Sequence, residues 1–83
     1  MHMYKFQHVP DVEELLLNSL GVDLILESPG DNLVYFHNGD KMTVNTATGE
    51  MCWEPIEPGS MSTSKLALRF HQWWGKGLIR ELK

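Results

Sequence analysis

The sequence contains one cysteine, Cys52, so no disulfide can form within the chain. It also has no apolar run near the roughly 18 residues that a membrane-spanning helix requires. The first residues show no basic cluster followed by an apolar stretch, which argues against a signal peptide. These absences predict a cytoplasmic protein that has no membrane span and lies in a reducing compartment.

The motifs of the common catalytic and cofactor sites are missing as well. Cys52, His8, His37 and His71 form no C-x-x-C or H-x-x-x-H pair, so we predict no metal site. Neither glycine-rich phosphate-binding motif occurs, and we predict no cofactor. Cys52 has no basic neighbour in the sequence to lower its pKa and make it a nucleophile. We therefore predict no catalytic residue and expect a protein that is not an enzyme.

Basic residues are scarce in the first sixty positions. Residues 1–60 hold ten acidic side chains and two lysines, a net charge of −8, whereas residues 61–83 hold five basic side chains and Glu81, a net charge of +4. The total is −4. Such a split can mark a binding surface, but it is more often explained by a basic helix that packs beside an acidic body.

What the sequence does have is enough for one small domain. Its 83 residues are 42% hydrophobic and 22% charged, which is close to the average of globular proteins. A chain of this length buries only about two thirds of its unfolded surface, so its core is thin. We predict a single α+β domain over residues 1–83.

The order of the elements follows from periodicity and turn residues. Apolar residues at helical spacing predict a helix at 11–20, with Asp11 and Glu14 at the spacing of a capping box. Apolar and alternating segments between turns predict an antiparallel meander of three to four strands over about 22–54. Asn38-Gly39 predicts a tight hairpin within it. A C-terminal helix over about 62–82 follows, and both helices are expected to pack on one face of the sheet. Alternation at 4–8 permits one further short strand.

The C-terminal segment is the most informative stretch. If residues 64–83 form one helix, a turn of about 100° per residue places all five basic residues on one stripe. Its aromatic neighbours are Trp73 and Trp74, which point about 100° apart, so that one is expected in the core and the other exposed. The predicted partner-binding residues are Lys65, Arg69, Trp73, Trp74, Lys76 and Arg80. Gly75 and Gly77 either end or kink this helix. The alternative interpretation is a solvated basic face opposite the core.

Three functions are compatible with these features. The first is a protein-interaction module, such as a regulator, inhibitor or accessory subunit, that binds a partner protein through the C-terminal segment or through an acidic surface. The residues of that acidic surface are Glu13, Asp23, Glu27, Asp31 and Asp40. An enzyme is the least favoured of the three. A homodimer is also considered, because the core is thin.

The second function is nucleic-acid binding by the basic helix. The helix–meander–helix order is similar to that of double-stranded-RNA-binding domains. That family's lysine cluster at the start of the last helix is represented here by Lys65 alone, and the strand at 50–54 is additional to the family's order. The net charge of −4 disfavours this alternative, because it repels phosphate at long range.

Overall fold

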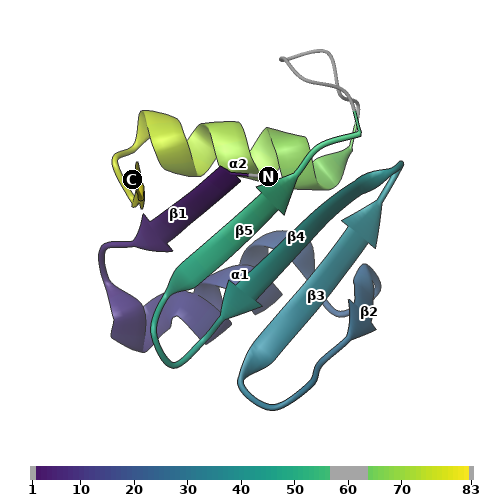
Figure 1. Cartoon of the computed structure of the whole chain (residues 1–83), viewed down its shortest axis with the longest axis horizontal. Coiled ribbons are helices and arrows are strands. Elements are labelled where there is room, and N and C mark those ends of the chain that lie inside the picture. The colour runs from purple at the N-terminus through teal and green to yellow at the C-terminus, as the bar shows by residue number, and fades with distance from the viewer. Residues whose placement is uncertain (1, 57–63, 83) are drawn as a thin grey trace.

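Six antiparallel strands form a single sheet in the computed structural model, which describes residues 2–56 and 64–82 (Figure 1). The order across the sheet is β2-β3-β4-β5-β1-β6. The strands are β1 (His2–Phe6), β2 (Ile25–Glu27), β3 (Asn32–His37), β4 (Asp40–Asn45), β5 (Glu50–Glu54) and β6 (Ile79–Glu81). The helices of the described residues are a 3-10 turn at Val9–Asp11, α1 (Val12–Leu20) and α2 (Lys65–Gly75).

The predicted α+β class is confirmed, as is the antiparallel meander, which runs from β2 to β5. The sheet has six strands and not three to four, because both ends of the chain add to it: the further strand that the sequence permits at 4–8 forms as β1 at His2–Phe6, and β6 was not predicted. β1 pairs with β5, and β6 pairs with the other side of β1. β1, β5 and β6 are all additional to the element order of double-stranded-RNA-binding domains, so this sheet differs from theirs.

The hairpin between β3 and β4 forms where the sequence predicts it. Asn38 and Gly39 have φ angles of 50° and 88°, which is the left-handed pair that a tight two-residue turn requires. β2, the first strand of the meander, is shorter than the sequence predicts. Val22 lies in a turn, with its carbonyl accepting from the N–H of Ile25, and its side chain is exposed. The meander therefore begins at Ile25 and not at about residue 22, although the carbonyl of Leu24 accepts from the N–H of Phe36 in β3.

The core lies between the sheet and the two helices, which cover the same face (Figure 1). Alternate strand residues point into it, and each helix contributes residues at helical spacing. Trp53 of β5 stacks on Phe70 of α2, with 5.2 Å between ring centroids and 9° between planes. The buried members are Tyr4, Phe6, Val12, Leu16, Leu20, Tyr35, Met42, Val44, Met51, Trp53, Leu66, Ala67, Phe70, Trp73 and Ile79.

The predicted capping box at the start of α1 does not form. Asp11 occupies the N-cap position, but its side chain accepts no capping hydrogen bond. Its carboxylate lies 3.0 Å from Nε2 of His8 instead. The reason is the preceding 3-10 turn, which begins at Val9 and includes Pro10, and which brings His8 over Asp11.

No helix among the described residues is long and apolar enough to span a membrane.

Candidate functional site

The position of α2 is determined by a polar cluster at its N-terminus. Ser64 is the N-cap, and its hydroxyl oxygen accepts from the backbone N–H of Ala67 at 3.0 Å. The same hydroxyl donates to the carboxylate of Asp40, which is fully buried at the start of β4. Asp40 also accepts from the N–H of Ile56 at 2.8 Å. The sequence also allows Ser62 or Thr63 as the cap of this helix, and both lie outside the described residues.

The C-terminal end of α2 corrects the prediction of a helix continuing to about residue 82. The N–H of Gly77 donates to Trp74 at 3.1 Å, and that of Leu78 donates to Trp73 at 2.9 Å. This pair of bonds, with a φ of +72° at Gly77, is a Schellman C-cap. The chain then reverses into β6, so that the α-helix ends at Gly75.

The single basic stripe is therefore wrong. Lys65 and Lys76 stay at the two ends of α2, but Arg80 is carried onto β6. Arg69 remains on the helix, where its Nε donates to the carbonyl of Ser19 at 2.9 Å and its Nη1 donates to Gln72 at 2.8 Å. Arg69 thus joins α2 to the last turn of α1, and its role in the structure is to hold the two helices together.

The two adjacent tryptophans differ in exposure, as their helical spacing predicts. Trp73 is 3% exposed and packs on Phe6, with 5.2 Å between ring centroids. Trp74 is 50% exposed, and its ring meets Tyr4 edge-on at 5.8 Å. Because Tyr4 pairs with Glu81, the exposed indole lies over β1, one strand from the edge formed by β6.

Arg80 lies on the opposite side of the same edge. Side chains alternate along a strand, so Ile79 and Glu81 face the helices while Arg80 faces away from them. Arg80 pairs with Lys5 of β1, which places two cations side by side on the uncovered face. Within residues 2–56 and 64–82, neither cation lies within ion-pair distance of a carboxylate.

The acidic surface loses one of its five predicted members. Glu13, Asp23, Glu27 and Asp31 are exposed, and Glu13 and Asp31 line one hollow beside the β2–β3 turn. Asp40 is instead fully buried at the N-terminus of α2. It follows a hairpin in the sequence, and its burial depends on a contact with Ser64, 24 residues away.

Asp40, Ser64 and His37 bring together the residue types of a hydrolytic triad, but in an arrangement unsuited to that chemistry. The hydroxyl of Ser64 donates directly to Asp40, and Ser64 is 2% exposed. Nδ1 of His37 accepts from the backbone N–H of Lys65 at 3.0 Å. A general base would have to accept the serine proton. In this cluster the serine and histidine both cap the helix.

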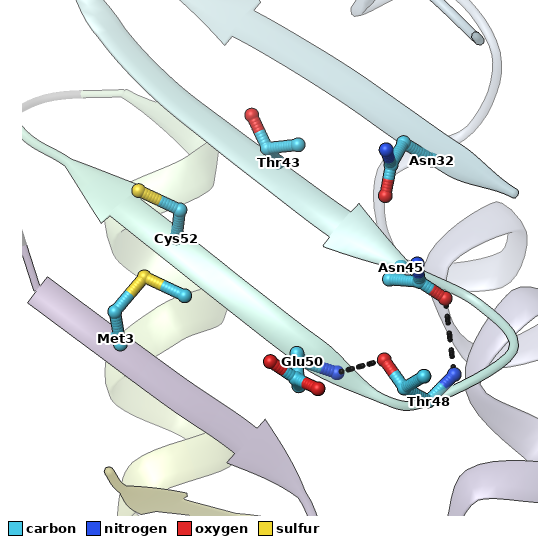
Figure 2. A pocket seen from close by; sticks show the side chains of 7 residues that line it. All are labelled: Met3, Asn32, Thr43, Asn45, Thr48, Glu50 and Cys52. Atoms are coloured by element: carbon cyan, nitrogen blue, oxygen red, sulfur yellow. Dashed lines mark hydrogen bonds between the residues drawn. The ribbon is translucent and has the colours of Figure 1, made fainter. Parts of the chain in front are cut away.

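The uncovered face of the sheet carries a shallow hollow (Figure 2). Its volume is about 230 Å³, below the range of about 300–1,000 Å³ of small-molecule sites. Its lining residues, from β1, β3, β4, β5 and the β4–β5 turn, are Met3, Asn32, Thr43, Asn45, Thr48, Glu50 and Cys52. The pKa of the Cys52 thiol is raised by burial and by Glu54, which opposes formation of the nucleophilic thiolate.

Among the described residues, His, Cys, Asp and Glu side chains form no group of three or more that could hold a metal ion. Comparisons with protein-family models, with curated proteins and with solved structures find no match to this chain.

The structure brings together some of the predicted site residues and separates others. Trp74, Lys76 and Arg80 lie around the junction of α2 and β6, whereas Lys65 lies at the far end of α2 and Arg69 contacts α1. Lys5 is the residue that the sequence did not nominate. The signal that would have placed Arg80 correctly is Gly77-Leu78, since a glycine followed by an apolar residue is the signature of a Schellman cap.

Proposed function

We propose that this chain is a small non-enzymatic protein-interaction module, a regulator, inhibitor or accessory subunit that binds its partner through the α2–β6 surface. This surface consists of Trp74, Lys76 and Arg80, with Lys5 beside Arg80. The observation that carries the proposal is the half-exposed indole of Trp74. Tryptophan and arginine are the residue types most enriched at the energetically dominant positions of protein interfaces.

The surroundings of Trp74 support a role in binding. Its ring rests against Tyr4, which limits its motion and prepares it for contact with a partner. Leu68 is the comparable exposed apolar residue of α2, at 54%, but it lies on the outer face of the helix, away from the sheet. Trp74 is thus the exposed apolar side chain of α2 that contacts the sheet, on Tyr4 of β1, one strand from the edge formed by β6.

The nucleic-acid alternative rested on one continuous basic stripe. Arg69 is engaged with Ser19, and Arg80 lies on a separate element, so that stripe does not exist. Treating a captured complex with nuclease tests this alternative, because a partner that is held through nucleic acid would be released.

Affinity capture from the source cell tests the proposal. The wild-type protein is compared with the double variant Trp74→Ala, Arg80→Glu and with the matched control Leu68→Ala, Lys65→Glu, which also removes one exposed apolar group and reverses one charge. We expect a partner protein that the wild type and the control retain and the double variant loses. Equal retention by both variants, or a partner released by nuclease treatment, would contradict the proposal.

A further inference from the structure

We propose that the partner adds an extended strand to the free edge of β6, and that this segment carries an acidic side chain between two apolar ones. This inference rests on the proposed function, because it specifies what the α2–β6 surface binds. Its basis is the backbone of β6 and the side chains on its two sides.

The register of β6 leaves part of its backbone directed away from the sheet. The N–H of Leu82 donates to Met3, and the carbonyl of Leu78 accepts from Gln7. Since backbone groups alternate along an antiparallel strand, residues 78, 80 and 82 bond to β1. The N–H and C=O groups of Ile79 and Glu81 therefore point outward, as two donors and two acceptors spaced for another strand. An extended peptide can pair with such an edge by β-augmentation.

The side chains beside this edge define what the added strand would carry. On the uncovered face it would meet Arg80, with Lys5 behind it, so a carboxylate at that position is favoured. On the helix-covered face it would meet the apolar Ile79 at one position and Glu81 at the other, with Tyr4 and the exposed indole of Trp74 behind Glu81. Glu81 lies on that second face and disfavours further acids there. The predicted pattern is apolar–acidic–apolar.

A second copy of this chain fits the edge poorly. If two β6 strands paired about a two-fold axis centred on residue 80, Arg80 of one copy would lie directly opposite Arg80 of the other. Centring the axis on residue 81 would oppose two Glu81 side chains. Like charges directly opposite each other destabilise a strand pair. Centring the axis on residue 79 avoids a like-charge pair but places the apolar Leu78 opposite Arg80. Charge complementarity at Arg80 therefore favours a different, acidic chain as the occupant.

The test begins with selection of random twelve-residue peptides, displayed on phage, against the intact 83-residue protein. We expect the enriched peptides to share the apolar–acidic–apolar pattern. One such synthetic peptide is then titrated by fluorescence anisotropy. Arg80→Glu should weaken binding about tenfold or more, whereas the matched control Lys65→Glu should leave it within about twofold. A peptide with its acid replaced by lysine should regain affinity for the Arg80→Glu variant.

Amide hydrogen exchange reports the strand pairing itself. Adding the peptide should slow exchange of the N–H groups of Ile79 and Glu81 and leave that of Leu26, on the opposite edge, unchanged. The variant Glu81→Pro removes one outward donor and no bond to β1, and should lower affinity at least about tenfold. If this variant does not fold, strand addition is tested by the exchange measurement and by the Arg80→Glu substitution alone.

Each failure has its own signature. Enriched peptides without the pattern, no enrichment, or binding without protection of Ile79 and Glu81 would overturn strand addition. So would protection of those amides that appears with rising protein concentration in the absence of peptide, since a second copy would then occupy the edge. A captured partner lost on changing Trp74 and Arg80 would, in each of these cases, leave the proposed function intact.

Discussion

The carboxylate of Asp40 accepts a hydrogen bond from the hydroxyl of Ser64, the residue that caps α2. Asp40 also accepts from the N–H of Ile56, so a single buried side chain holds both ends of the connection between β5 and α2. The position of α2, and with it that of Trp74, depends on this contact between a hairpin and a helix cap.

Removing either partner should destabilise the fold. Asp40→Ala leaves the Ser64 hydroxyl and the Ile56 N–H without their charged acceptor, and we expect a loss of about 2–3 kcal/mol in the free energy of unfolding. Ser64→Ala should cost about 1 kcal/mol through loss of the cap. Urea denaturation measures both. Asp31→Ala, at an exposed acid, is the control and should stay within about 0.5 kcal/mol. Equal effects at Asp40 and Asp31 would contradict this role of Asp40.

The sequence predicts the fold well where the signals are local. The hairpin at Asn38-Gly39 follows from two residues that tolerate positive φ, and the opposite exposures of Trp73 and Trp74 follow from helical spacing. The cap of α2 is only partly local. Ser64 fits its role by type, but the burial of Asp40 depends on a contact across 24 residues that periodicity does not encode.

The ends of the chain show the limits of periodicity more clearly. Ile79–Glu81 is three residues long, too short to distinguish a strand from a last helical turn by pattern. It becomes a strand because the Schellman cap at Gly77 reverses the chain and β1 offers a free edge. The candidate site was predicted as one helical stripe, and that geometry is wrong, because Lys65 and Arg69 lie away from Arg80, which is on β6.

The two glycines at the C-terminal end of α2 give opposite predictions. Gly77 has a φ of +72°, so Gly77→Ala should lower the free energy of unfolding by about 1 kcal/mol. Gly75 is helical, and a methyl group added there would meet no atom of the described residues within 4 Å, so Gly75→Ala should raise it by about 0.5–1 kcal/mol. Thermal or urea denaturation compares them. Stabilisation by both substitutions would indicate a helix that continues past Gly77.

Arg69 should behave as a structural residue. Arg69→Ala removes the bond from its Nε to Ser19, and we expect a loss of about 1 kcal/mol in the free energy of unfolding. Lys65→Ala, at an exposed cation with no such bond from its side chain among the described residues, should change it by less than about 0.5 kcal/mol. Salt-dependent binding of duplex RNA that both substitutions weaken equally would restore the nucleic-acid alternative.

Tyr35 offers a test of the core and of pH dependence. Its hydroxyl is buried and has no hydrogen-bond partner among the described residues, so Tyr35→Phe should stabilise the protein by about 1 kcal/mol. Burial, and secondarily Glu13, raises the pKa of Tyr35. A raised pKa in the folded state means that stability is retained below the usual tyrosine pKa of about 10 and is lost as the pH rises above it.

Denaturation of wild type and Tyr35→Phe between about pH 7 and 11 checks both statements. The variant should lose less stability above about pH 10 than the wild type does. Tyr4, whose pKa burial and Glu81 also raise, keeps some alkaline sensitivity in both proteins. A variant that is less stable near neutral pH, with the same alkaline dependence, would mean that the Tyr35 hydroxyl has a partner.

Binding through the α2–β6 surface is tested most directly by one pair of dissociation constants, measured with the captured partner. Trp74 and Leu68 are both about half exposed on α2, but Trp74 adjoins β1 and β6 while Leu68 lies on the outer face. Trp74→Ala should weaken binding of the partner about tenfold or more, and Leu68→Ala should leave it within about twofold. Equal weakening by the two substitutions, or no weakening by Trp74→Ala, would contradict binding through the α2–β6 surface.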